Sequence, residues 1–270
     1  MAFLPGSMKT IREFAAAKAE GRKIVVITAY DAWSARLLAD APVDCLLVGD
    51  SVMMTLYGER DTLGATTEIM ATHTRLVARG APDKLIVADL PFLAVRKGFA
   101  HALDSAAALL RAGAHAVKAE GIRGHADVLH HLVESGIPVM GHLGLTPQSV
   151  HALGGYKVQA KEPAEAAQLR TDAAALQEAG CFSTVLECVP AALAKSVTES
   201  LKIATIGIGA GADCDGQVLV FHDLLGLTPD FKPKFVRRFA DSASVMKTGV
   251  VAYAEAVRSG TFPGEKESFR

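Results

Sequence analysis

The sequence predicts one domain over residues 1–270, a (β/α)8 barrel of the TIM type with an extra helix before its first strand. Three observations support this prediction. Short apolar runs alternate seven or eight times with longer, alanine-rich amphipathic segments. Half of the 270 residues are apolar, which is enough for one large core, and no stretch has the composition of a linker. Repeated βα units of this number and length are typical of a (β/α)8 barrel.

The predicted strands are short runs that are apolar almost throughout, as expected of parallel strands covered on both faces. A weaker eighth run follows seven clearer ones. In chain order they are KIVVITAYD (23–31), CLLVGDS (45–51), KLIVADLPF (84–92), AVKAEG (116–121), IPVMGHLG (137–144), STVLECV (183–189), ATIGIGAG (204–211) and the weaker VLVFHDLLG (218–226).

The segments between these runs carry helix signals. In ATTEIMATHTRLVARGA (65–81), Thr66 or Thr67 is a suitable N-cap and Gly80 a stop. Thr146-Pro147 has the cap-then-proline form of a helix start. The other predicted helices are the extra N-terminal one at 8–19, those that end at Gly113 (LDSAAALLRAGA, 103–114) and Gly180 (162–180), and a last one at 234–260 with Phe235, Phe239, Met246, Val250, Tyr253 and Val257 at helical spacing.

An open, doubly wound sheet is the main competing fold. It is disfavoured because polar residues end many of the strands instead of gathering at one switch point. The glycine-rich stretch GIGAGADCDG (207–216) would let a ligand approach the backbone, but a turn is the simpler interpretation.

Composition narrows the function. A net charge of −1 without a Lys/Arg run argues against nucleic-acid binding. No apolar run approaches the ~18 residues of a membrane span, and MAFLPGSMKTIREF (1–14) lacks the pattern of a secretory signal. We therefore expect a cytoplasmic protein that does not bind membranes. Without CxxC or metal-finger spacing, the four cysteines are expected to be reduced thiols that pack as small apolar groups.

Polar residues stand where the predicted strands end, which is where a barrel places its active site. Alternation along a strand puts Leu46, Val48 and Asp50 on one face, and likewise Leu85, Val87 and Asp89. If these faces line the barrel, three carboxylates from adjacent strands converge at its rim. They are Asp50, Asp89 and Glu120.

Three facing carboxylates repel one another unless a cation lies between them. An all-oxygen set favours a hard ion, Mg²⁺ or Mn²⁺, whereas zinc more usually recruits histidine or cysteine. The alternative is that each carboxylate caps a helix or pairs with an arginine. For a single aspartate at a strand end, that alternative would be the better interpretation. It is the weaker one for three carboxylates on neighbouring strands that are accompanied by an inward lysine.

Lys118 stands two residues before Glu120, so both side chains leave the same face of one strand. Lys118 would offset the carboxylates and bind an anionic substrate. A Schiff-base role is the alternative, which the nearby negative charge disfavours. Glu187, on a more distant strand, is placed to act as general acid or base, or to form a salt bridge under a loop. His142 either binds substrate or orients another group.

These motifs resemble those of the 3-methyl-2-oxobutanoate hydroxymethyltransferase (ketopantoate hydroxymethyltransferase) family of pantothenate biosynthesis. The resemblance runs in order from about residue 24 to the C-terminus. The matching motifs are TAYD (28–31), LLVGDS (46–51), ADLPF (88–92), VKAEG (117–121), GHLGLTPQS (141–149), GGYKVQ (154–159), LECVP (186–190), IGIGAG (206–211) and FPGEKESF (262–269).

The resemblance implies a barrel of the phosphoenolpyruvate/pyruvate type. It implies transfer of a hydroxymethyl group from 5,10-methylenetetrahydrofolate to 3-methyl-2-oxobutanoate, a 2-oxo acid, with Glu187 as catalytic base. It also implies a homo-oligomer, typically a decamer. The site residues it implies are Asp50, Asp89 and Glu120 around Mg²⁺, with Ser51 and Lys118 joining Asp50 and Asp89 on the substrate.

Three positions depart from the family pattern. Met53 stands where glycine is usual, Gly64 where proline is common, and Ile122 where a second glycine is frequent. The first two lie in a loop, 51–65, that is long enough to cover the site. None of the three replaces an expected ligand.

Two other functions compete. One is a lyase or mutase of the related phosphoenolpyruvate/isocitrate-lyase group, but the cysteine-bearing lid motif of such enzymes finds no match in this sequence. The other is a barrel that binds a metal–ligand complex without turning it over, which leaves the predicted base, Glu187, without a purpose.

Overall fold

The structure is a computed structural model that describes residues 8–230 and 233–269. It divides into two compact units, one ending at Val220 and the next beginning at Phe221. One domain over residues 1–270 stays a prediction. Residues 1–7, on which the expectation of no secretory signal partly rests, lie outside the described residues. Within the described part of the chain, no helix combines the length and apolarity needed to cross a bilayer.

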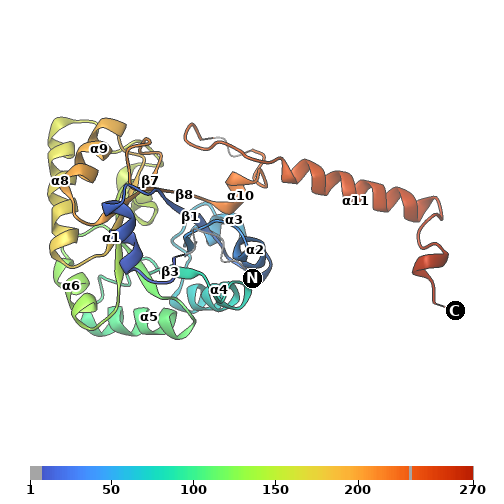
Figure 1. The fold of residues 1–270 in the computed structure, drawn as a ribbon, viewed down its shortest axis with the longest axis horizontal. Coiled ribbons are helices and arrows are strands. Elements are labelled where there is room, and N and C mark those ends of the chain that lie inside the picture. Colours follow the sequence, from blue (N-terminus) through green and yellow to red (C-terminus); the bar gives the residue numbers. More distant parts are fainter. Residues whose placement is uncertain (1–7, 231–232, 270) are drawn as a thin grey trace. The chain divides into compact units, whose positions relative to one another are not determined.

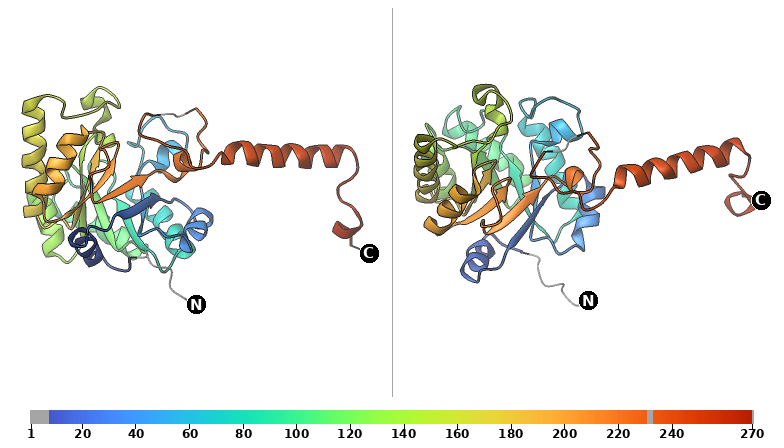
Figure 2. Two further views of the ribbon diagram at one scale, coloured as in Figure 1. Left: turned by 45° about the horizontal axis from the view of Figure 1, so that its top comes forward. Right: turned by 90° about the horizontal axis from the view of Figure 1, so that it is seen from above.

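The first unit is a closed barrel of eight parallel strands that pair in chain order, which confirms the predicted fold (Figure 1). Helices surround the strands in the two further views (Figure 2). The strands are β1 (Ile24–Thr28), β2 (Cys45–Val48), β3 (Leu85–Asp89), β4 (Ala116–Glu120), β5 (Val139–Gly144), β6 (Ser183–Glu187), β7 (Ala204–Ile208) and β8 (Gly216–Leu219).

The predicted helices are present, with shifted ends. Thr66 caps α4 through its side chain, as one of the two expected caps. In the first unit the helices are α1 (Arg12–Ala19), α2 (Ala32–Ala39), α3 (Val52–Thr55), α4 (Thr67–Gly80), α5 (Phe99–Arg111), α6 (Ala126–Glu134), η1 (Pro147–Ser149), α7 (Val150–Leu153), α8 (Pro163–Glu178) and α9 (Ala191–Ser200).

The prediction for the eighth strand is wrong in its bounds. β8 begins at Gly216 and ends at Leu219, so only two residues of the predicted run 218–226 belong to it. A Cβ on Gly216 would stand 2.5 Å from the Ile24 carbonyl oxygen, so this strand can start only with a glycine. In a sequence, a glycine at this position indicates a turn, so the sequence analysis placed the start of the strand too late. The residues between β7 and β8 form the expected turn.

The extra N-terminal helix is confirmed as α1, starting at Arg12 rather than Met8. Its residues Phe14 and Ala17 belong to the same buried cluster as the inward residues of the strands, including Ile24 and Ala204. The Phe14 ring meets that of Phe182 edge-on at 5.2 Å. The barrel interior is therefore a packed core at this level, and α1 is part of it.

The second unit contains α10 (Phe221–Leu224), α11 (Ser242–Arg258) and η2 (Glu265–Glu267). The predicted last helix, 234–260, is shorter than expected, because Phe235 and Phe239 precede α11. Figure 2 shows α11 as one unbroken helix. It buries none of its residues against the rest of its own unit, although Met246, Val250, Tyr253 and Val257 form an apolar stripe along it.

Candidate active site

Strand register brings the predicted site residues of β3 to β6 side by side. Asp89 pairs with Lys118 across β3 and β4, and Glu120 pairs with His142 across β4 and β5. Glu187 stands opposite Gly144 at the end of β6. Because these strands are parallel, their carboxyl ends form one rim of the barrel, where the sequence predicted the site.

Asp50 reaches this rim by a different route from the predicted one. The β2 residues in the buried cluster inside the barrel are Cys45 and Leu47. The prediction that Leu46, Val48 and Asp50 form the inward face is therefore wrong. The chain leaves the strand after Val48 and turns toward α3. This turn, and not the alternation of the strand, directs Asp50.

The turn joins the ends of β2 and β3 through hydrogen bonds. The backbone N–H of Asp50 donates to Asp89 Oδ2 over 3.1 Å. A Cβ on Gly49 would meet the Ser51 hydroxyl at 2.8 Å, so a side chain there would collide with the site. Ser51 Oγ in turn lies 2.7 Å from the hydroxyl of Tyr30, which is fully buried just beyond β1. Burial raises the pKa of Tyr30, so it stays a neutral hydroxyl.

Lys118 is buried and forms an ion pair with Asp89, with 3.0 Å between Nζ and Oδ1. Burial alone would lower its pKa, but Asp89, Glu120 and Asp50 together raise it above its usual value. A lysine held in its charged form is a poor nucleophile. The structure therefore favours the electrostatic role of Lys118 over the Schiff-base alternative.

His142 links the predicted metal ligand to the predicted base. Its Nδ1 lies 3.3 Å from Glu120 Oε1, and its Nε2 lies 3.1 Å from Glu187 Oε2. Both contacts are ion pairs outside hydrogen-bond geometry, whereas Nδ1 and Lys118 Nζ meet that geometry at 3.3 Å. Burial and Lys118 lower the pKa of His142, but Glu120 and Glu187 outweigh them and raise it to about 9. Both ring nitrogens face protein groups, which favours an orienting role over substrate binding.

The site carries an excess of negative charge. Two cationic side chains, Lys118 and His142, stand among four carboxyl groups. Burial, followed by the charges of Asp89 and Glu120, raises the pKa of Asp50 well above its usual value. A divalent cation would balance this charge and return Asp50 to its ionised form. The donor set therefore fits a hard ion such as Mg²⁺.

The carboxylates do not form a closed cage. Across residues 8–230 and 233–269, no three histidine, cysteine or acidic side chains converge closely enough to hold an ion by themselves. Mg²⁺ is commonly held by one or two carboxylates, with water and substrate as its other ligands. An open arrangement of this kind is compatible with Mg²⁺ and leaves ligand positions for a substrate.

Gln148 is a site residue that the sequence analysis did not single out. Its side-chain amide donates to Asp50 Oδ2 over 2.8 Å and to the Leu90 carbonyl over 2.9 Å. Its backbone N–H donates to Glu120 Oε2 over 3.0 Å. Thr146-Pro147 signalled a helix start here, and a polar side chain in the first turn after a strand end was the available clue.

Solved structures of the same fold include a phosphonopyruvate hydrolase in complex with oxalate and Mg²⁺, with a TM-score of 0.61 and 13% identity. That alignment covers 96% of this chain and 93% of the other. A 2,3-dimethylmalate lyase of the phosphoenolpyruvate mutase/isocitrate lyase superfamily has a TM-score of 0.61 and 15% identity, covering 97% and 89%. These likenesses show the fold.

Comparison with curated relatives covers nearly the whole chain. A 3-methyl-2-oxobutanoate hydroxymethyltransferase from Bdellovibrio bacteriovorus is 50% identical over 97% of this chain and all of its own length. Its counterpart in Coxiella burnetii is 48% identical over 93% of this chain and 95% of its own length. The family model for ketopantoate hydroxymethyltransferase matches residues 8–265. The chain therefore belongs to the ketopantoate hydroxymethyltransferase family of transferases.

Proposed function

We propose that this chain transfers a hydroxymethyl group from 5,10-methylenetetrahydrofolate to 3-methyl-2-oxobutanoate, giving 2-dehydropantoate in the first step of pantothenate biosynthesis. One observation supports this most directly. Buried acidic and basic side chains from adjacent strands meet at one rim, and His142 connects them to Glu187. This arrangement suits the removal of a proton from carbon next to the keto group of a bound 2-oxo acid.

Asp50, Asp89 and Glu120 would hold Mg²⁺. When bound, Mg²⁺ would supply Lewis-acid stabilisation to the carboxylate and keto oxygens of the 2-oxo acid. Lys118 adds a fixed positive charge beside Asp89. Gln148 donates to Asp50 and Glu120, and holds both carboxylates in place. Ser51, positioned by Tyr30, offers a hydroxyl to the substrate.

Glu187 removes the C3 proton of the substrate in this proposal. Its Oε2 lies 3.1 Å from His142 Nε2, which places the Glu187 carboxylate beside the other residues of the site. The C3–H bond breaks, and C3 forms a new bond to the one-carbon unit of the donor. The two bonds between that carbon and the nitrogens of the donor break, and one water supplies the oxygen of the new hydroxyl group. The remaining protons go to the nitrogens of tetrahydrofolate. The products are 2-dehydropantoate and tetrahydrofolate.

Exchange of the C3 proton with solvent deuterium tests this function and needs no folate. Wild-type protein should exchange the proton of 3-methyl-2-oxobutanoate only with Mg²⁺ present, and should form 2-dehydropantoate only when the folate donor is added. Glu187→Gln should slow exchange by about 10²–10⁴-fold, the usual contribution of a general base. Glu178→Gln, an exposed change at the end of α8, is the matched control. Normal exchange in Glu187→Gln would remove Glu187 from its role.

A lyase, a mutase or a non-catalytic binder would fail the same assay in different ways. A lyase or mutase would change the substrate without consuming folate. A binder would take up Mg²⁺ and the 2-oxo acid without exchanging the C3 proton.

We further propose that the active form is a homo-oligomer. The apolar stripe of α11 supports this, because Met246, Val250, Tyr253 and Val257 stay exposed, although the Tyr253 ring meets that of Phe262 at 5.4 Å. Exposed apolar stripes of this kind mark protein interfaces. The decameric size is implied by the family resemblance alone.

A further inference from the structure

The short helix α3 is held at both ends by side chains that lie outside it. Ser51 occupies its N-cap position, yet the Ser51 hydroxyl does not cap the helix. Ser51 Oγ instead lies 2.7 Å from the hydroxyl of Tyr30. Just beyond the last turn of α3, the hydroxyl of Tyr57 lies 3.2 Å from His73 Nε2, and the two rings meet edge-on at 5.7 Å. A helix of four residues is too short to be stable by itself, so its position depends on contacts of this kind.

His73 connects the two supports of α3. It lies on α4 and is only 7% exposed. Its Nδ1 lies 2.6 Å from the carbonyl oxygen of Tyr30. A carbonyl oxygen only accepts hydrogen bonds, so Nδ1 carries a proton and is the donor. In the neutral imidazole Nε2 is then an acceptor, and it receives the hydrogen bond of the Tyr57 hydroxyl.

These contacts and the helix form a closed ring that includes Ser51. One side of the ring runs from the Ser51 hydroxyl to the side chain of Tyr30, and from the carbonyl of Tyr30 to His73. The other side runs from His73 through Tyr57 and back along α3. Because His73 is buried on α4 and contacts both supports, it fixes where the Ser51 hydroxyl stands.

Asp50 precedes Ser51 in the chain but has supports of its own. Its backbone N–H donates to Asp89 over 3.1 Å, and its carboxylate accepts a hydrogen bond of 2.8 Å from Gln148. Neither of these contacts involves His73. A change at His73 should therefore displace the Ser51 hydroxyl more than it displaces the proposed metal ligand.

We propose that His73 is a positioning residue for the 2-oxo acid and acts through the Ser51 hydroxyl. This inference rests on the proposed function, in which Ser51 binds the substrate. The ring holds the hydroxyl in place before the substrate arrives, so binding does not have to immobilise it. Both ring nitrogens of His73 contact protein groups, so His73 acts on the substrate only through its neighbours.

Two substitutions of His73 separate its two contacts. The amide nitrogen of asparagine takes nearly the position of Nδ1, and that of glutamine nearly the position of Nε2. His73→Asn should keep the contact with the Tyr30 carbonyl, and His73→Gln the contact with the Tyr57 hydroxyl. Each should raise the KM for 3-methyl-2-oxobutanoate in the Mg²⁺-dependent C3 exchange by about fivefold, the equivalent of one hydrogen bond, and His73→Phe should raise it further. The maximal exchange rate should stay unchanged, because the Ser51 hydroxyl binds substrate and transition state alike.

A Ser51→Ala background distinguishes positioning from a general structural effect. With the Ser51 hydroxyl absent, His73→Phe should not raise the KM any further, whereas a structural disturbance would raise it in both backgrounds. An equal rise in the two backgrounds would overturn the proposal, as would a His73→Phe protein with the KM of wild type. If the wild-type protein does not exchange the C3 proton, the proposed function fails and the substrate role of His73 fails with it.

Amide hydrogen–deuterium exchange of the substrate-free protein tests the ring without the reaction. The amides of residues 52–57 should exchange faster in His73→Phe and in Tyr57→Phe than in wild type. Tyr57→Phe removes a single hydroxyl from a half-exposed residue, so this variant should fold. Unaltered amide exchange in both variants would show that α3 does not depend on the ring, and would overturn the proposal while the proposed function stands.

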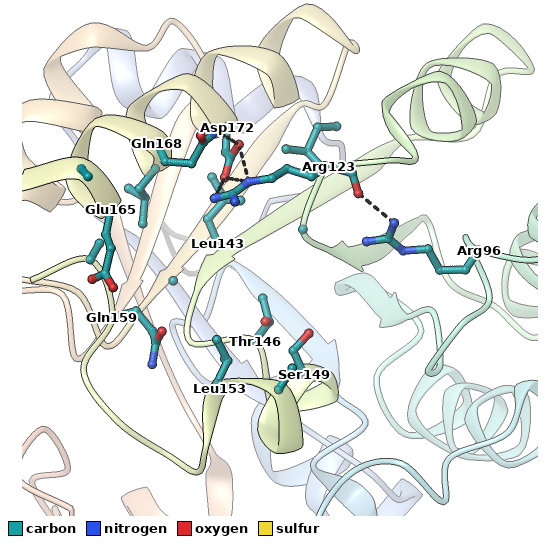
Figure 3. Close-up of a pocket in the computed structure, with 17 residues that line it drawn as sticks. Arg96, Arg123, Leu143, Thr146, Ser149, Leu153, Gln159, Glu165, Gln168 and Asp172 are labelled. Atoms are coloured by element: carbon teal, nitrogen blue, oxygen red, sulfur yellow. Dashed lines mark hydrogen bonds and ion pairs between the residues drawn. The ribbon is translucent and has the colours of Figure 1, made fainter. Parts of the chain in front are cut away.

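Gln168→Ala is the control for both measurements. Gln168 also lies on a helix outside the barrel, and its Nε2 donates to Asp172 Oδ1 over 2.9 Å (Figure 3). It lines a pocket to which neither α3 nor His73 contributes a residue. The control should leave both the KM and the amide exchange of α3 unchanged. A control that altered them as strongly as His73→Phe would contradict a specific role for His73.

Discussion

Gln148 Nε2 donates a hydrogen bond of 2.8 Å to Asp50 Oδ2, although 98 residues separate the two in sequence. The same residue contacts Glu120 through its backbone. Gln148 therefore connects the short helix after β5 to the Asp50 carboxylate in the turn after β2 and to the Glu120 carboxylate at the end of β4.

We expect Gln148→Ala to lower the affinity for Mn²⁺, used in place of Mg²⁺, by about tenfold. A hydrogen bond to a charged group contributes about 1.5–3 kcal/mol. Calorimetric titration of the metal would measure this, with Gln217→Ala as control. Gln217 also donates to a backbone carbonyl, that of Gly211, away from the carboxylates. If Gln148→Ala bound Mn²⁺ with unchanged affinity, Gln148 would have no role in positioning the carboxylates and would only contribute to packing.

Lys118→Met should destabilise the metal-free protein and make it more responsive to Mg²⁺. Removing one partner of a buried ion pair costs about 3–5 kcal/mol. The uncompensated carboxylates should then bind the cation more tightly, so the rise of Tm with Mg²⁺ should exceed that of wild type. Lys84→Met is the matched control, since Lys84 is equally buried but donates to the carbonyls of Ala41 and Val43. Equal Mg²⁺ responses in the two variants would contradict this electrostatic role.

Met53 and Gly64 should be energetically coupled. A Cβ on Gly64 would lie 3.2 Å from Met53 Cε, closer than ordinary contact. The methionine therefore occupies space that a side chain at position 64 would need. Gly64→Ala should raise the free energy of unfolding by about 0.4–1 kcal/mol only in a Met53→Ala background. The substitution restricts the unfolded chain in either background, but with Met53 present the close contact of the new Cβ opposes that stabilisation. Urea unfolding of the four proteins measures the coupling, and additive effects would contradict it.

All four cysteines are free and buried, as the sequence predicts. Burial raises their pKa values, to about 12 for Cys181 and about 11 for Cys188. Because the thiolate is the reactive form, iodoacetamide at pH 8 should leave the folded protein unmodified and should alkylate four thiols in guanidinium. Cys188 should react before Cys181 as the pH rises toward 11, which peptide mass spectrometry would show. Rapid alkylation of the folded protein at pH 8 would contradict the burial.

Val250→Asp should reduce the size of the assembly. Val250 lies in the middle of the apolar stripe of α11, and a buried carboxylate there would oppose association. Thr248→Asp adds the same charge on the opposite side of the helix and should have no effect. Light scattering after size exclusion would compare both with wild type, given a chain mass of 28.3 kDa. A monomeric wild-type protein would overturn the proposal.

The sequence by itself determined the barrel and the candidate chemistry. Apolar continuity marks a parallel strand locally, so the first seven strands could be recognised from their own residues. Lys118 and Glu120 could be assigned to one face because alternation holds throughout β4. Asp50, Asp89 and Glu187 stood out because each is a carboxylate at the end of an apolar run.

Tertiary structure decided the features that depend on how separate segments meet. β8 starts at a glycine because Ile24, on a neighbouring strand, leaves no room for a side chain. Asp50 faces the site because the chain exits β2 early, against the alternation of that strand. Gln148 reaches Asp50 only once eight strands have closed into a ring. Local periodicity records which element a residue belongs to, whereas strand exits and distant contacts depend on packing between elements that are far apart in sequence.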